Sequence, residues 1–190
     1  MSPLDPERLP PETIRPLKRV EYDHLVELGA FQDERVELLY GWLVAMSPQG
    51  AAHSFVVREL LNLLAVALAG RAKVQVQAPL AASDESEPEP DLAVLPPASY
   101  VDDHPTTAHL VVEVADSSRT KDLTIKARLY AEIAVPEYWV ADLARGMLVV
   151  HREPAIDRYA EVRTYGRDGE VALLRFPDVV VRIADILPPR

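Results

Sequence analysis

The chain has 190 residues, of which 48% are hydrophobic and 26% charged, a balance typical of one globular domain and not of a disordered chain. It has no cysteine, which excludes disulfides, iron–sulfur clusters and cysteine nucleophiles. Twenty basic residues against thirty acidic ones give a net charge of −10, which excludes a protein that coats nucleic acid with a broad basic surface.

The N-terminal residues 1–18 contain five prolines and predict an extended arm before a single domain over residues 19–190. The most apolar stretch, residues 60–69, is about ten residues long, whereas a membrane span needs about twenty. The first residues also lack the pattern of a signal peptide. We therefore expect a cytoplasmic protein that does not bind a membrane.

The first half of the domain predicts two helices and a hairpin between them. Apolar residues recur at helical spacing over residues 20–28, and glycine ends that helix. Two apolar runs within residues 35–46 surround Tyr40 and Gly41, which predicts a β-hairpin. Helical spacing continues over residues 51–69 and predicts the longest helix of the chain.

The second half predicts short strands and one more long helix. We expect strands at residues 73–80, 91–95, 109–115, 137–143 and 147–153, with further short strands within residues 158–183. The helix is expected at residues 122–134, after a segment rich in N-cap residues. The sequence SDESEPEP, residues 83–90, predicts an acidic loop with no apolar anchor. This order of elements predicts a mixed β-sheet flanked by helices.

Several common catalytic motifs do not occur in the sequence. It contains no glycine-rich phosphate loop, no GxSxG nucleophile turn and no HExxH zinc helix. The five histidines form no ligand pair at helical spacing. The candidate chemistry therefore rests on carboxylates.

Glu113 is an acid inside the apolar strand LVVEVA, where an unpaired carboxylate is costly. Asp91 opens the preceding strand, directly after the acidic loop. If the two strands are neighbours, the two carboxylates meet at one edge of the sheet, and oxygen ligands of this kind suit Mg²⁺ or Mn²⁺. The alternative is that Glu113 pairs with an arginine and Asp91 caps a loop.

Lys126 lies on the helix that follows the Glu113 strand, with Asp122 and Tyr130 one turn to either side. Because that helix packs back over the strand that precedes it, Lys126 could hold an attacking water or stabilise charge on a phosphate. The alternative is an ion pair between Lys126 and Asp122 on a solvated face.

Three segments carry a resemblance to a known family: VELLYGWLVAMSP at 36–48, EPEPDLAVL at 87–95 and LVVEVADSSRTKDLTIKARLYAEIAVPEYWVAD at 110–142. They resemble the Uma-type family of restriction-endonuclease-like proteins, a branch of the PD-(D/E)XK nuclease superfamily, over roughly residues 20–150. The resemblance implies a restriction-endonuclease-like core and hydrolysis of phosphodiester bonds that depends on Mg²⁺ or Mn²⁺. The implied substrate is nucleic acid, with DNA preferred, and a homodimer would be natural for cutting both strands.

By position in these motifs, Asp91 and Glu113 match the metal-binding acids of the family. The superfamily usually has a lysine two residues after the glutamate, where this chain has Ala115, and Lys126 matches the lysine that replaces it. The further candidate site residues are Glu37, His53 and Asp122. Positive charge near the site is expected from Arg119, Lys121, Lys126 and Arg128.

Two other functions compete with the nuclease. One is a catalytically inactive, nuclease-derived binding or assembly module, which the net charge and Ala115 favour. The other is a glycosidase with two carboxylates, which the aromatic content of 6% disfavours because few rings are available to stack on sugars. Dependence on a divalent metal distinguishes the nuclease from both.

Overall fold

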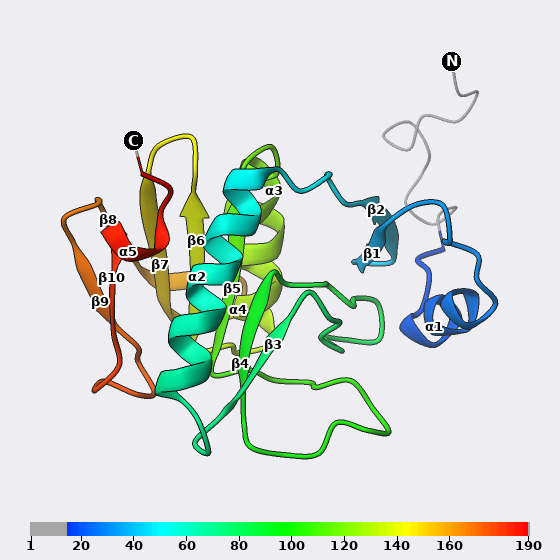
Figure 1. The fold of residues 1–190 in the computed structure, drawn as a ribbon. Coiled ribbons are helices and arrows are strands. Elements are labelled where there is room, and N and C mark those ends of the chain that lie inside the picture. Colours follow the sequence, from blue (N-terminus) through cyan, green and yellow to red (C-terminus); the bar gives the residue numbers. More distant parts are fainter. Residues whose placement is uncertain (1–14, 190) are drawn as a thin grey trace.

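The structure of the chain is a computed structural model, and it describes residues 15–189 (Figure 1). Most of the predicted N-terminal arm, residues 1–18, lies outside the described residues. Residues 15–18 form neither helix nor strand. The single domain over residues 19–190 stays a prediction.

The elements follow one another in the order α1 (Arg19–Glu27), β1 (Val36–Leu39), β2 (Trp42–Ala45), α2 (Ala51–Ala67), β3 (Lys73–Val76), β4 (Leu92–Leu95), β5 (Leu110–Ala115), α3 (Arg119–Lys121), the π-helical turn η3 (Asp122–Lys126), α4 (Ala127–Glu132), β6 (Glu137–Asp142), β7 (Met147–Pro154), β8 (Tyr159–Tyr165), β9 (Glu170–Ala172), β10 (Val180–Arg182) and α5 (Ile183–Ile186).

Six strands form the central sheet, in the order β3-β4-β5-β6-β7-β8. Neighbouring strands are antiparallel except β5 and β6, which are parallel and are joined by the helical segment α3-η3-α4. Figure 1 shows α2 in front of the sheet and α4 behind it. The predicted mixed sheet flanked by helices is confirmed.

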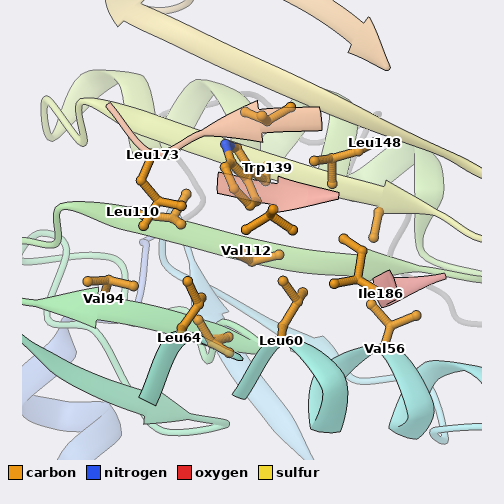
Figure 2. Packing of buried hydrophobic residues seen from close by; sticks show 14 of the residues in the cluster. Val56, Leu60, Leu64, Val94, Leu110, Val112, Trp139, Leu148, Leu173 and Ile186 are labelled. Atoms are coloured by element: carbon orange, nitrogen blue, oxygen red, sulfur yellow. The ribbon is translucent and has the colours of Figure 1, made fainter. Parts of the chain in front are cut away.

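The two faces of the sheet bury two separate apolar layers. Val112 and Val114 of β5 pack in the layer that contains α2, whose inward residues include Leu60 and Leu64 (Figure 2). Alternate residues of β5 point to the opposite face, where Val111 packs in the layer that contains α4. Because side chains alternate along a strand, Glu113 faces α4 together with Val111.

The predicted hairpin forms, and its turn has the geometry that the sequence suggests. Tyr40 and Gly41 both have positive φ angles, 51° and 78°, as a two-residue hairpin turn of type I′ requires. A side chain on Gly41 would also collide with Pro16, because a Cβ atom there would lie 2.2 Å from the proline ring. Glycine is therefore required at this position.

The acidic loop at residues 83–90 differs from its prediction, since it is anchored to the hairpin. Leu38 of β1 and Glu87 exchange two backbone hydrogen bonds, of 2.7 and 3.3 Å. Ser86 and Glu87 are buried. The loop extends the hairpin as a third chain segment. It is anchored by this backbone pairing and by polar side chains, such as the Ser86 hydroxyl oxygen that accepts from the Tyr40 N–H.

Two element boundaries also differ from the sequence-based ones. The long helix begins at Arg119 rather than at Asp122 and includes a π-helical turn. Strand β3 ends at Val76, because Gln77 adopts a positive φ of 48° that extended structure cannot accommodate.

No helix within residues 15–189 has both the length and the apolar character needed to cross a bilayer.

Candidate active site

Asp91 and Glu113 lie next to each other on neighbouring strands. The antiparallel register pairs Leu92 with Val112, so the residue before β4 lies beside Glu113 of β5. The backbone N–H of Val114 donates a hydrogen bond of 2.8 Å to Asp91 Oδ2. This bond fixes the carboxylate of Asp91 beside β5, at the edge of the sheet that the sequence pattern predicted.

Glu113 is held from the helical side by two donors. Lys126 Nζ and the Tyr130 hydroxyl both donate to Glu113 Oε1, over 2.9 and 3.0 Å. Within the part of the chain that the structure describes, Oε2 of Glu113 accepts no hydrogen bond. One oxygen is therefore committed to orienting the carboxylate, and the other is free to bind a ligand.

Lys126 is shared between two carboxylates. Its Nζ lies 2.8 Å from Glu37 Oε2 of the hairpin and 2.9 Å from Glu113 Oε1. Lys121 Nζ binds the other oxygen of Glu37 at 2.7 Å. Only 2% of the Lys126 side chain is exposed, so the solvated ion pair with Asp122 considered from the sequence is wrong. The wide turn of η3 directs both Asp122 and Lys126 into the protein.

A cavity of about 50 Å³ opens at this cluster, large enough for a metal ion or a water. Five carboxylates, two lysines and one histidine supply its charged lining. Glu37 lies behind the cavity and binds both lysines. The carboxylates that face the cavity therefore outnumber the positive charge available to them.

The pKa of Glu113 is raised by its burial first and by this imbalance second. Burial raises its pKa well above the usual value, Lys126 opposes the rise, and the negative charges of Asp91, Asp122 and Glu37 add to it. Burial also opposes the charged form of Lys126, but Glu113 and Glu37 outweigh it and raise the lysine's pKa. Lys126 is thus firmly cationic, and Glu37 and Glu113 share its ammonium group.

His53, in the first turn of α2, contacts the second oxygen of Asp91. Its Nε2 lies 3.0 Å from Asp91 Oδ1. Its Nδ1 is buried, and among the described residues it has no hydrogen-bond partner. His53 therefore contacts one oxygen of Asp91 while the Val114 N–H donates to the other.

The donor set of the cavity fits a small hard cation. Asp91 and Glu113 supply carboxylate oxygens, and Mg²⁺ or Mn²⁺ bound by one or two carboxylates keeps several waters. Among residues 15–189, no three side chains of histidine, aspartate or glutamate are grouped so that they could enclose a metal. A divalent cation at this position would also offset the negative charges of Asp91 and Asp122, which add to the effect of burial on the pKa of Glu113.

All six candidate residues from the sequence meet in one place. Asp91, Glu113, Lys126, His53 and Asp122 line the cavity, and Glu37 lies directly behind it. The alternative pairing of Glu113 with an arginine is wrong, because its partner is Lys126. Ala115 is fully buried in the apolar layer on the Glu113 side.

The site contains residues that the sequence did not single out. Glu89, Asp116 and Ser118 also line the cavity. Asp116 and Ser118 directly follow β5, and their position after a strand that carries a candidate ligand was the signal that could have found them. None of the four basic residues expected near the site carries free positive charge. Arg119 binds Asp142 and Arg128 binds Glu132, while Lys121 and Lys126 both bind Glu37.

Comparison with known proteins adds a family and a fold. Residues 20–184 match the sequence model of the Uma2 family, described as "Putative restriction endonuclease". The fold is similar to the crystal structure of a protein from Anabaena variabilis described as "a putative nuclease belonging to DUF820", with a TM-score of 0.73 at 13% identity. The alignment covers 90% of this chain and 97% of that one, and it confirms the expected nuclease-type core. No curated protein matches the chain.

Proposed function

This chain belongs to the Uma2 family, and on that premise we propose that it is a metal-dependent nuclease that hydrolyses phosphodiester bonds of nucleic acid, DNA above all. The observation that carries the proposal is the cavity where Asp91 and Glu113 lie beside Lys126 with too little positive charge around them. Bound Mg²⁺ or Mn²⁺ would supply Lewis acidity and a more acidic water.

The protein's own contribution is to position three groups. The Val114 N–H and His53 hold Asp91, and Tyr130 holds Glu113, so both carboxylates present their oxygens in fixed directions. Lys126 offers an ammonium group beside Glu113, where it can orient a water or offset charge that develops on the phosphate.

Glu37 supports this arrangement from behind the cavity. It binds Lys126 and keeps the lysine charged in a buried place. Lys126 thereby fills on the helix the role that Ala115 cannot fill on the strand.

The proposal is tested with the full chain and labelled DNA and RNA, single- and double-stranded, in Mn²⁺, Mg²⁺ or EDTA. We expect cleavage with either metal and none in EDTA. Asp91→Asn and Glu113→Gln should each lower the rate at least about a hundredfold. Substituting a residue that only supports a metal ligand already lowers activity by up to about a hundredfold, and the loss of a ligand itself should cost no less. Asp157→Asn, an exposed carboxylate in the turn between β7 and β8, should cleave as the wild type does.

An inert wild type, tested with both metals and all four substrates, would favour the inactive binding or assembly module instead. Cleavage that survives in EDTA, or in both cavity variants, would contradict the metal site itself. A homodimer that cuts both strands is part of the proposal, and it would show as paired breaks in duplex DNA.

A further inference from the structure

A second hollow, of about 400 Å³, lies between the turn after β6 and the C-terminal residues. Arg145 and Arg167 line it, and among residues 15–189 no carboxylate does. The cavity at Asp91 has five carboxylates in its lining, and the whole chain has a net charge of −10. A hollow whose described charged residues are all positive therefore differs from the acidic character of the rest of the chain.

The charge of Arg167 is not paired with a carboxylate of residues 15–189. Among the described residues, its guanidinium forms no salt bridge. Its two terminal nitrogens donate instead to the backbone carbonyls of Leu187 and Pro188, and its Nε is buried with no hydrogen-bond partner within residues 15–189. The carbonyls orient the side chain, and its positive charge has no ion-pair partner among the described residues.

Arg145 brings positive charge from the other side of the hollow. It lies 3.2 Å from Asp142, but the same carboxylate oxygen lies 2.6 Å from Arg119. Two guanidinium groups thus share one carboxylate. About half of the Arg145 side chain is exposed, so it can turn toward a ligand without breaking the fold.

The hollow adjoins the candidate active site through the first turn of α2. Ala52 lines the hollow, while Gly50 and His53 of the same turn line the cavity at Asp91. The turn after β6 is also tied to the end of β5, because the Leu143 N–H donates to the Ala115 carbonyl over 3.0 Å. Figure 1 shows the start of α2, the end of β6 and the chain after α5 at the same end of the molecule.

We propose that this hollow binds a backbone phosphate of the nucleic-acid strand that is cut in the neighbouring cavity, with Arg145 and Arg167 as its ligands. The inference rests on the proposed nuclease function and locates the strand on the protein. Guanidinium groups suit this task because their planar N–H groups match two phosphate oxygens at once. The first turn of α2 adds favourable polarity, since it contains no acidic residue and Gly50 provides no side-chain cap.

The experiment measures binding of a short fluorescein-labelled DNA duplex, and of its single strand, by fluorescence anisotropy in EDTA, where cleavage is prevented. Arg145→Ala and Arg167→Ala should each raise Kd about tenfold. Each should also lower the slope of log K against log salt by about one, as the loss of one phosphate contact does. Arg158→Ala is the matched control, because Arg158 is exposed, forms no salt bridge with the described residues and follows the far end of β7.

Each outcome decides one of the two proposals. Variants that bind as tightly as Arg158→Ala, while the wild type cleaves in Mn²⁺, overturn the phosphate site and leave the nuclease standing. If the wild type never cleaves but the two variants bind the DNA more weakly than it does, the phosphate site is supported and the nuclease is contradicted. A wild type that binds no nucleic acid overturns both. If Arg167→Ala fails to fold, Arg145→Ala and Arg167→Lys replace it in the test. Arg167→Lys keeps the positive charge but loses the planar guanidinium group that binds two phosphate oxygens at once.

Discussion

At the scale of single residues, Lys126 holds together two carboxylates that come from distant parts of the chain. Glu37 arrives on the hairpin and Glu113 on the central strand, and both bind the same ammonium group. Removing a cation from between two buried carboxylates leaves uncompensated charge in a place with little water. Removing one of the carboxylates leaves Lys126 with the other. The two sides of the cluster should therefore respond very differently to substitution.

We predict that Lys126→Met destabilises the protein by about 3–5 kcal/mol, whereas Glu113→Gln in EDTA costs little or is stabilising. The reason is that Lys126 keeps Glu37 as a partner when Glu113 loses its charge, and that burial of ionised Glu113 is unfavourable. Urea unfolding of both variants in EDTA measures the difference. A loss of several kcal/mol in Glu113→Gln would mean that Glu113 is an indispensable half of an ion pair and would count against a metal ligand.

At the scale of elements, the loop at residues 83–90 joins the hairpin to α1. Its Glu87 pairs with Leu38 through the backbone, and its side chain lies 3.7 Å from Arg19 of α1. The side chain is only 3% exposed, and its Oε2 has no hydrogen-bond partner among residues 15–189. Burial and the nearby negative charge of Asp23 raise the pKa of Glu87 to about 7.

Because of this raised pKa, the contribution of Glu87 to the stability of the folded protein depends on pH. The folded protein holds the Glu87 proton more tightly than the unfolded chain, so the stabilisation is complete below the ordinary pKa of glutamate and is lost as pH rises through about 7. Relative to Glu87→Gln, the wild type should lose about 1–3 kcal/mol of unfolding free energy between about pH 5 and pH 8.5. Urea unfolding at both pH values measures it. Asp84→Asn, exposed in the same loop, is the control, and an equal pH response in both variants would disprove the role of Glu87.

At the scale of the whole molecule, a net charge of −10 means that binding of a polyanion depends on local positive charge. Most arginines near the site are already paired with acids, as Arg119 and Arg128 are. The cation that the cavity would bind and the hollow at Arg145 and Arg167 are two neighbouring places where an anionic strand could be attracted. Metal binding and strand binding are therefore expected to support each other.

We predict that Mn²⁺ stabilises the folded protein by about 1.4 kcal/mol at a concentration tenfold above its Kd, because a ligand that binds only the folded state adds RT ln(1 + [L]/Kd). Glu113→Gln should gain much less, and Asp157→Asn should gain as much as the wild type. Thermal unfolding across a Mn²⁺ titration measures these gains. Equal gains in the wild type and Glu113→Gln would place the metal elsewhere on the chain.

Local sequence patterns were enough to predict most of the elements of the fold. The spacing of apolar residues predicted α2, the apolar run LVVEVA predicted β5, and Tyr40-Gly41 predicted the hairpin turn. Each of these depends on interactions within a few residues, namely helical periodicity, burial on both faces of a strand, or a turn that needs positive φ. The candidates Asp91 and Glu113 followed from acids placed beside or within apolar strands.

The partners of those residues depended on the tertiary structure. Nothing near Lys126 in the sequence indicates Glu37, which lies on another element and reaches the lysine only when the hairpin packs beside η3. The anchored loop at Glu87 depends in the same way on backbone pairing with β1. The sequence by itself determined which residues are costly to bury, because that cost belongs to the residue and its strand. Only the tertiary structure decided which charges compensate each other, because Coulomb interactions depend on distance in space and not along the chain.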